Sequence, residues 1–170
     1  MESVILMGPP GAGKSTVGKY LAKLSKKPFI DTDRLIEERE GCSIGDIFLE
    51  KGEAGFREIE KGVVLEVLHH DDSIIALGGG SILDEEIQRK LEAKKNVIFL
   101  DVSISNAAPR VGFNKERPLL VGNPRQQWLQ LMEKRRDIYE RLATQKVSTD
   151  NRKAHEVAEE IAARVQLWRT

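Results

Sequence analysis

A complete phosphate-binding pattern lies near the N-terminus, where residues 8–16 read GPPGAGKST directly after the apolar run from Val4 to Met7. Its glycines let consecutive backbone N–H groups converge on phosphate oxygens, and a helix that begins here adds its dipole. In this pattern Lys14 reaches the outer phosphates, and the hydroxyl of Ser15 binds the Mg²⁺ that accompanies a nucleoside triphosphate. An ordinary glycine-rich turn is the alternative, which the complete pattern disfavours. We therefore expect a nucleoside triphosphate here, contacted by Gly11, Ala12, Gly13, Lys14, Ser15 and Thr16.

Two aspartates, Asp31 and Asp33, lie two residues apart after the next apolar run. We expect them at the carboxyl end of a strand beside the phosphate loop, where α/β proteins bind their ligands. One is suited to a metal ion, and the other to orienting or deprotonating an alcohol that accepts a phosphoryl group. The alternative is that Asp31 caps the following helix and Asp33 complements its dipole. The two residues on their own leave both interpretations open.

Two arginines lie where they can hold an anionic acceptor. Arg57 precedes Glu60 by three residues on a predicted helix, so the two can pair, and a plain surface ion pair is the alternative. Arg135 falls near the centre of a predicted apolar helical face, whereas Arg136 falls towards its edge. An inward guanidinium requires either a structural carboxylate or an anionic ligand, and the sequence favours neither. The apolar face consists of Trp128, Leu131, Met132, Tyr139 and Leu142.

Three consecutive glycines, Gly78, Gly79 and Gly80, follow the third apolar run. A plain turn needs only one or two glycines, so three favour the close approach of a ligand to this backbone. The polar stretch of residues 110–123 contains Gly and Pro and shows no helical or strand periodicity. It predicts a mobile lid from which Arg117 can cover the phosphates, and a solvated basic loop is the alternative.

The elements that must position these residues alternate along the chain, which predicts an α/β fold built on a parallel sheet of about five strands. Helical apolar stripes are formed by Phe56, Ile59, Val63 and Val67, and by Val157, Ile161, Val165 and Trp168. Ligands of such a fold bind at the carboxyl ends of the strands, where the candidate residues fall. The predicted strands are Val4 to Met7, Pro28 to Ile30, Ile74 to Leu77, Val97 to Leu100 and Lys146 to Ser148.

Composition narrows the class of protein further. The 170 residues suit a single domain spanning 1–170, and 27 basic residues balance 27 acidic ones, so no net field favours nucleic acid or a membrane. Cys42 is the only cysteine, and neither a targeting segment nor an apolar run of membrane-spanning length is present. Cysteine and histidine show no metal-ligand spacing. We expect a cytoplasmic protein, most simply a monomer.

Taken together, several segments resemble the shikimate kinase family in order and spacing over nearly the whole chain. They are the phosphate loop, DTD at 31–33, GCSIGDIF at 41–48, GFREIE at 55–60, ALGGGSIL at 76–83 and ERPLL at 116–120. The resemblance implies a P-loop kinase fold of three layers, similar to nucleoside-monophosphate kinases, with a five-stranded parallel sheet. It also implies ATP-dependent phosphorylation of the 3-hydroxyl of shikimate in aromatic amino acid (chorismate) biosynthesis.

The resemblance further implies roles for individual residues. In the substrate-binding region, about residues 31–60, Asp33 would bind the shikimate hydroxyls and act as a base. Arg57 and Arg135 would hold the carboxylate, beside a wall of Gly78, Gly79 and Gly80. Lys14 and Arg117 would stabilise the transferred charge. For the nucleotide and metal, the implied contacts are Ser15 to Mg²⁺, Asp31 to metal-bound water, and Arg110 and Arg152 to adenine.

Two features depart from the family pattern. Ser148-Thr149 and Ala154 stand where an Asp-Thr pair and a proline are common near adenine, and Pro109 precedes Arg110 unexpectedly.

Two other functions are the alternatives. A related small-molecule kinase, such as a gluconate kinase, shares the phosphate loop but would need a different anionic handle. A nucleotide-dependent switch is suggested by Asn114-Lys115, but Arg117 replaces the aspartate that a guanine signature requires.

Overall fold

A sheet of five parallel strands forms the centre of the computed structural model, which describes residues 2–111 and 123–167. The strand order is β2-β3-β1-β4-β5. Every residue of β1 and β3 is buried, because helices cover both faces of the sheet, and their sequences are accordingly apolar throughout. The strands are β1 (Val4–Met7), β2 (Phe29–Asp31), β3 (Ile74–Ala76), β4 (Val97–Asp101) and β5 (Gln145–Ser148).

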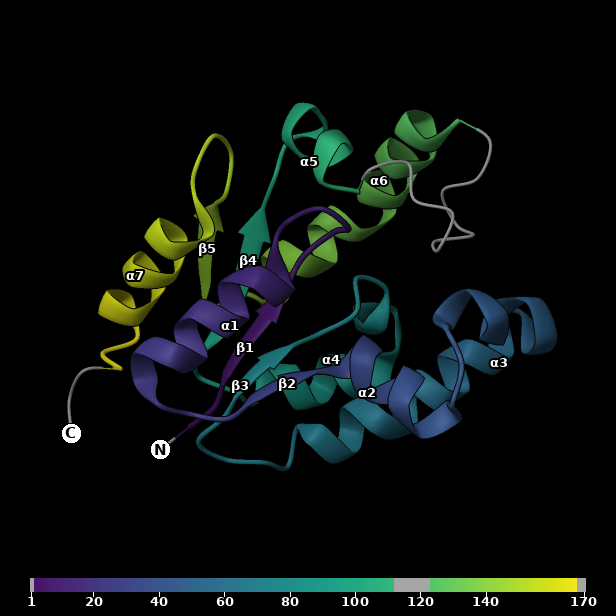
Figure 1. Cartoon of the computed structure of the whole chain (residues 1–170), viewed down its shortest axis with the longest axis horizontal. Coiled ribbons are helices and arrows are strands. Elements are labelled where there is room, and N and C mark those ends of the chain that lie inside the picture. Colours follow the sequence, from purple (N-terminus) through teal and green to yellow (C-terminus); the bar gives the residue numbers. More distant parts are fainter. Residues whose placement is uncertain (1, 112–122, 168–170) are drawn as a thin grey trace.

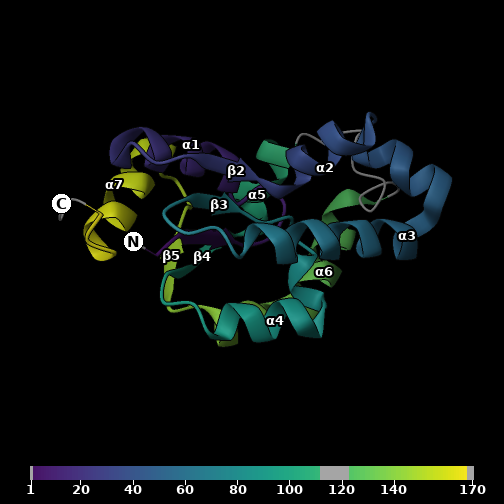
Figure 2. The same cartoon turned by 90° about the horizontal axis from the view of Figure 1, so that it is seen from below.

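The helices form two layers around the sheet (Figure 2). Helices α1 (Lys14–Ser25) and α7 (Ala154–Arg164) pack against each other on one face, and α4 (Glu85–Glu92) and α6 (Pro124–Leu142) lie on the opposite face. This arrangement confirms the predicted three-layer α/β class.

Helices α2 (Thr32–Glu40) and α3 (Ile44–Val67) pack together and extend beyond the sheet (Figure 1). Helix α3 is kinked at Gly52, which has a φ of 70° and a ψ of 178°. The expected stripe lies after the kink, with Phe56, Val63 and Val67 buried. Helix α3 also contacts the short 3-10 turn η1 (Ser81–Leu83), and Arg57 lies beside Gly80, which precedes this turn.

The register of the strands brings the candidate segments to one edge of the sheet. Asp31 pairs with Ala76, and Met7 pairs with Phe99. The phosphate loop therefore follows β1 directly beside the glycines that follow β3, as the order of a doubly wound sheet requires. All five predicted strands are confirmed, and their ends differ from the predicted ones by at most one residue.

The boundaries of the predicted lid need a correction. Arg110 belongs to helix α5 (Ile104–Val111), and Asn123 caps α6 by accepting a hydrogen bond from the backbone of Gln126 at 3.2 Å. Pro109 lies inside α5, which continues to Val111 although a proline at an interior position removes one backbone donor and crowds the carbonyl four residues earlier. The segment 112–122 with Arg117, and also Trp168, lie outside the described residues.

Candidate active site

A cleft of about 760 Å³ opens at the carboxyl edge of the sheet around the phosphate loop. Lys14 is the first residue of α1, and its Nζ donates to the carbonyl oxygens of Gly8 at 2.7 Å and Pro9 at 3.1 Å. Gly11 has a φ of 83°, and a Cβ there would lie 2.8 Å from the carbonyl oxygen of Ala107 in α5. Only glycine therefore allows the loop to pass this close to α5. The cleft is lined by Gly11, Ala12, Gly13, Lys14, Ser15, Thr16, Val17, Asp31, Asp33, Arg34, Glu37, Ala76, Leu77, Arg110, Thr149, Arg152, Ala154 and Val157.

Ser15 and Asp31 meet within this cleft. The hydroxyl of Ser15 donates to Oδ2 of Asp31, while Oδ1 accepts from the backbone N–H groups of Asp33 at 3.1 Å and Arg34 at 3.2 Å. Asp31 therefore caps α2, as one of the two alternatives from the sequence predicted, and its other oxygen is directed to the phosphate loop. A hydroxyl and a carboxylate oxygen beside a phosphate site are the hard oxygen ligands that suit Mg²⁺.

The three glycines after β3, here called the glycine strip, bring the predicted acceptor residues together. A Cβ on Gly78 would lie 2.5 Å from Oδ1 of Asp33, one on Gly79 would lie 3.4 Å from Nη1 of Arg135, and one on Gly80 would overlap the guanidinium of Arg57. None of the three glycines has a positive φ. The glycines therefore make room for these three side chains, and no left-handed backbone conformation accounts for them.

Arg57 and Glu60 form a largely buried pair, which rules out the plain surface ion pair. Nη1 of Arg57 lies 2.8 Å from Oε1 of Glu60, whose side chain is only 3% exposed. The guanidinium also lies over the ring of Phe56, with Cζ 5.3 Å from its centroid. Because Glu60 is desolvated, it fixes the direction of Arg57 more strongly than an exposed carboxylate would.

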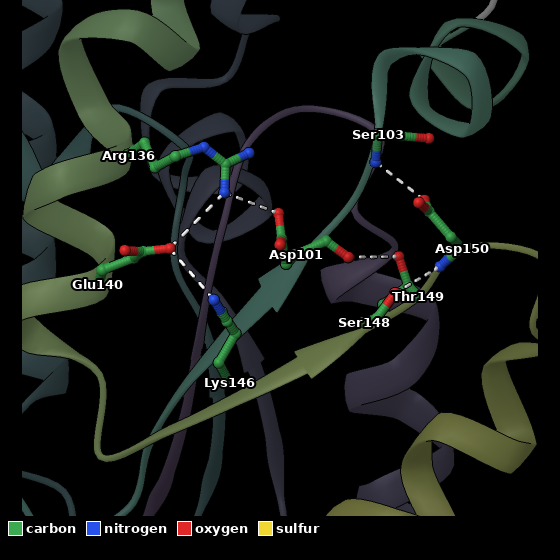
Figure 3. A network of polar contacts seen from close by, with 8 residues as sticks. All are labelled: Asp101, Ser103, Arg136, Glu140, Lys146, Ser148, Thr149 and Asp150. Carbon is green, nitrogen blue, oxygen red and sulfur yellow. Dashed lines mark hydrogen bonds and ion pairs between the residues drawn. The ribbon is translucent and has the colours of Figure 1, made fainter.

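The two neighbouring arginines of α6 have different surroundings. Arg135 is 3% exposed and faces the glycine strip, as the helical face predicted. Arg136 is the residue that takes a structural carboxylate, since its Nη1 lies 3.2 Å from Oδ1 of Asp101 at the end of β4 (Figure 3). Tyr139, one turn after Arg135, donates its hydroxyl to the carbonyl oxygen of Gly79. Arg135 thus lies buried beside Gly79, and its role as an anion-binding residue stays a prediction.

The opposite end of the cleft contains Arg110 and Arg152. Arg110 bridges two segments, because its guanidinium donates to Oγ1 of Thr149 at 2.9 Å, to the carbonyl oxygen of Thr149 at 2.7 Å and to that of Gly11 at 3.3 Å. Arg152 donates to the carbonyl oxygen of Ser148 at 3.1 Å and pairs with Glu160 at 2.6 Å. Both predicted adenine residues therefore line the cleft together with Thr149, which is 2% exposed.

The comparisons with known proteins agree with this geometry. The family model described as shikimate kinase matches residues 10–166. The chain belongs to the shikimate kinase family. Shikimate kinase of Streptomyces coelicolor is 44% identical over 164 residues, covering 96% of this chain and 95% of the relative. That of Thermobifida fusca is 46% identical over 158 residues, covering 93% and 91%.

Solved structures of the shikimate kinase family give the same result. The structure described as shikimate kinase from Acinetobacter baumannii in complex with shikimate has a TM-score of 0.95 and 33% identity, covering 99% of this chain and 95% of that one. A gluconokinase from Sinorhizobium meliloti shares only 19% identity at a TM-score of 0.57, which reflects the common fold alone. The family, the fold and the kinase activity predicted from the sequence are confirmed, and ATP is the phosphoryl donor that the family implies.

Sequence reasoning missed two contacts that hold the shikimate kinase site. Thr32 is fully buried, and its hydroxyl accepts from the backbone N–H of Gly78 at 3.1 Å and donates to the carbonyl oxygen of Ala76 at 3.3 Å. It thereby ties the aspartate pair to the glycine strip. Trp128 donates from Nε1 to the carbonyl oxygen of Pro10 at 2.8 Å. The position of Thr32 between two aspartates could have indicated its contact with the glycine strip. Nothing in the sequence indicated the contact between Trp128 and Pro10.

Proposed function

We propose that this chain phosphorylates the 3-hydroxyl of shikimate with ATP, giving shikimate 3-phosphate and ADP on the route to chorismate and the aromatic amino acids. The observation that carries the proposal is the glycine strip, where a carboxylate and two guanidinium groups converge on a backbone without side chains. A small polyhydroxylated acid offers hydroxyls for the carboxylate and an anion for the guanidinium groups. Family membership supports this acceptor over gluconate.

For the acceptor, we assign one role to each group at the strip. Arg57 and Arg135 would hold the carboxylate of shikimate, and their burial would make this attraction stronger than it is in water. Asp33 would orient the reacting hydroxyl and accept its proton. Gly78, Gly79 and Gly80 would form the wall against which the ring lies.

For the donor, the loop of Gly11, Ala12, Gly13, Lys14, Ser15 and Thr16 would bind the phosphates through backbone N–H groups and the ammonium of Lys14. In the nucleotide-bound enzyme Lys14 would exchange its loop carbonyls for phosphate oxygens. Ser15 and Asp31 would hold Mg²⁺, the latter through bound water. This ion would neutralise charge on the phosphates.

At the far end of the cleft, Arg110 and Arg152 would contact adenine. Arg110 is already held by Thr149 and Gly11, and it therefore presents a fixed guanidinium plane for stacking. Arg117 would cover the phosphates from the lid. Excluding water at this point prevents hydrolysis of ATP in place of transfer.

A further part of the proposal concerns the compartment, the oligomeric state and the binding partners of the enzyme. We propose a cytoplasmic monomer that acts on a small molecule and binds neither nucleic acid nor membranes. The balance of 27 basic and 27 acidic residues supports the part of this proposal that concerns nucleic acid and membranes. Within the described ranges, no helix is long and apolar enough to cross a membrane.

The function is tested by measuring ADP release from ATP and Mg²⁺, with shikimate, quinate, gluconate or nucleoside monophosphates supplied separately as acceptor. Stimulation by shikimate alone is the expected result. Stimulation by another acceptor instead would leave the phosphate loop assigned and would require a different interpretation of the glycine strip. Analysis of the product by phosphorus NMR identifies the hydroxyl that is phosphorylated.

A further inference from the structure

Tyr139 connects two parts of the acceptor wall that are far apart in sequence. It is fully buried in α6, its hydroxyl donates to the carbonyl oxygen of Gly79, and the guanidinium of Arg135, one turn earlier, lies close enough to interact with that hydroxyl. One phenol oxygen therefore contacts both the glycine strip and a guanidinium that faces it. A phenylalanine would fill the same space without the hydroxyl that makes these contacts.

The ring that carries this hydroxyl is held on its other side by strand β4. Tyr139 stacks on Phe99, with ring centroids 5.0 Å apart and an interplanar angle of 18°. The guanidinium of Arg136 lies 6.0 Å from the centroid of the Phe99 ring and pairs with Asp101 at 3.2 Å. In Figure 3 this pair continues through Glu140 to Lys146 of β5, with separations of 3.8 and 3.2 Å. The phenol is thus fixed against the sheet.

The hydroxyl also keeps its proton. Burial raises the pKa of Tyr139 to about 12, because the phenolate would be desolvated, although the charge and hydrogen bond of Arg135 oppose this shift. Tyr139 is therefore a hydrogen-bond donor throughout the neutral pH range. Its donation to Gly79 does not switch off when a carboxylate or an imidazole nearby titrates.

The planar peptide unit makes this contact directional. All described peptide bonds are trans, so the carbonyl oxygen of Gly79 and the N–H of Gly80 point in opposite directions. A donor that fixes the oxygen also fixes the N–H, which is held facing away from the phenol. Glycine has unusually soft backbone dihedrals, so without this bond the strip would sample other orientations of that peptide.

We propose that Tyr139 is a positioning residue for the acceptor, whose hydroxyl holds the Gly79 peptide and the Arg135 guanidinium in the geometry that binds the shikimate carboxylate. The inference rests on the proposed function, in which Arg135 and the glycine strip contact shikimate. It assigns to a buried tyrosine a part in substrate affinity as well as in packing.

The test compares Tyr139→Phe with wild type by steady-state kinetics and by calorimetric titration of shikimate. We expect the KM and the Kd for shikimate to rise about tenfold, the loss typical of a hydrogen bond to a charged group. The KM for ATP should stay within about twofold. Tyr20→Phe is the matched control, since Tyr20 is 42% exposed on α1, and it should behave like wild type.

A second variant separates positioning from packing. Phe99→Leu disturbs the ring stack but leaves the hydroxyl of Tyr139 in place, so we expect a lower melting temperature with nearly unchanged shikimate affinity. Equal losses of shikimate affinity in Phe99→Leu and Tyr139→Phe would overturn the proposal, as would wild-type affinity in Tyr139→Phe. In contrast, wild-type protein that neither binds nor phosphorylates shikimate would refute the proposed function itself.

Discussion

The indole N–H of Trp128 donates to the carbonyl oxygen of Pro10 at 2.8 Å, across 118 positions of sequence. The helix that carries Arg135 and Tyr139 thus also holds the phosphate loop. Trp128 and Tyr139 are eleven residues apart, close to three helical turns, and they lie on the same face of α6. One helix therefore contacts both the phosphate loop and the glycine strip.

Replacing Trp128 by phenylalanine removes this donor and leaves the buried oxygen of Pro10 without it. We expect a loss of about 1–3 kcal/mol in the free energy of unfolding and a KM for ATP that rises several-fold. Thermal unfolding and initial rates measure the two effects. Leu129→Ala is the control, because this neighbouring side chain is 48% exposed, and it should change neither quantity by much. An unchanged KM for ATP in Trp128→Phe would show that the phosphate loop is held without the indole.

Lys14→Ala should abolish turnover, with kcat falling at least about 10³-fold, because Lys14 is the cation expected to stabilise charge on the transferred group. The protein should stay folded, since the hydrogen bonds of the ammonium to Gly8 and Pro9 lie within the phosphate loop and join no distant elements. Lys19→Ala, which alters an exposed lysine further along the same helix, provides the control. Appreciable turnover in Lys14→Ala would remove this residue from the catalytic assignment.

Arg57→Ala should mainly weaken acceptor binding. We expect kcat/KM for shikimate to fall about 100-fold while the KM for ATP changes little. Some stability should be lost too, because Glu60 is left buried without its partner at 2.8 Å. Calorimetric titration of shikimate is the direct measurement, and normal affinity in this variant would contradict the role given to Arg57.

Gly80→Ala tests the space around the strip. The added methyl group would overlap the guanidinium of Arg57, so we expect the KM for shikimate to rise at least about tenfold. Gly62→Ala is the matched change in α3, where a Cβ would meet nothing within 4 Å. It should stabilise the protein by about 0.5–1 kcal/mol without affecting kinetics. Equal behaviour of the two variants would argue against a steric requirement at Gly80.

The pair between α2 and α3 predicts a dependence of stability on acidic pH. Hydrogen bonds from Arg39 at 2.7 Å hold the pKa of Glu66 below its usual value of 4.5. The unfolded chain then binds this proton more readily, so the contribution of Glu66 is complete above pH 4.5 and is lost as pH falls through the folded-state pKa. Melting temperatures of wild type and Glu66→Gln should differ at pH 7 and converge in acid. A constant difference across that range would contradict this linkage.

Patterns that are local in sequence were sufficient for most of the fold and much of the site. The phosphate loop, the apolar strands and the helical phase that separates Arg135 from Arg136 all depend on neighbours within a few turns. Asp31 both caps helix α2 and lies beside Ser15, because its two carboxylate oxygens face different partners.

The contacts that sequence could not supply join segments that meet only after folding. Trp128 and Tyr139 were assigned to an apolar face, which is correct for their rings. Their polar atoms find partners in Pro10 and Gly79 because β1, β3 and α6 are adjacent in three dimensions. The desolvation of Glu60 likewise follows from packing of α3 onto η1 and α4, which no short-range pattern reveals.

The glycine strip also bears on how this enzyme would respond to an inhibitor. A compound whose main contact is the backbone of Gly78, Gly79 and Gly80 would leave few routes to drug resistance. Any other residue at these positions would place a Cβ against Asp33, Arg135 or Arg57, respectively. At Gly78 and Gly80, where this Cβ would overlap its neighbour, a substitution that expelled the inhibitor would therefore also displace groups that we propose to hold the natural substrate, and the resistant enzyme would be a poor one.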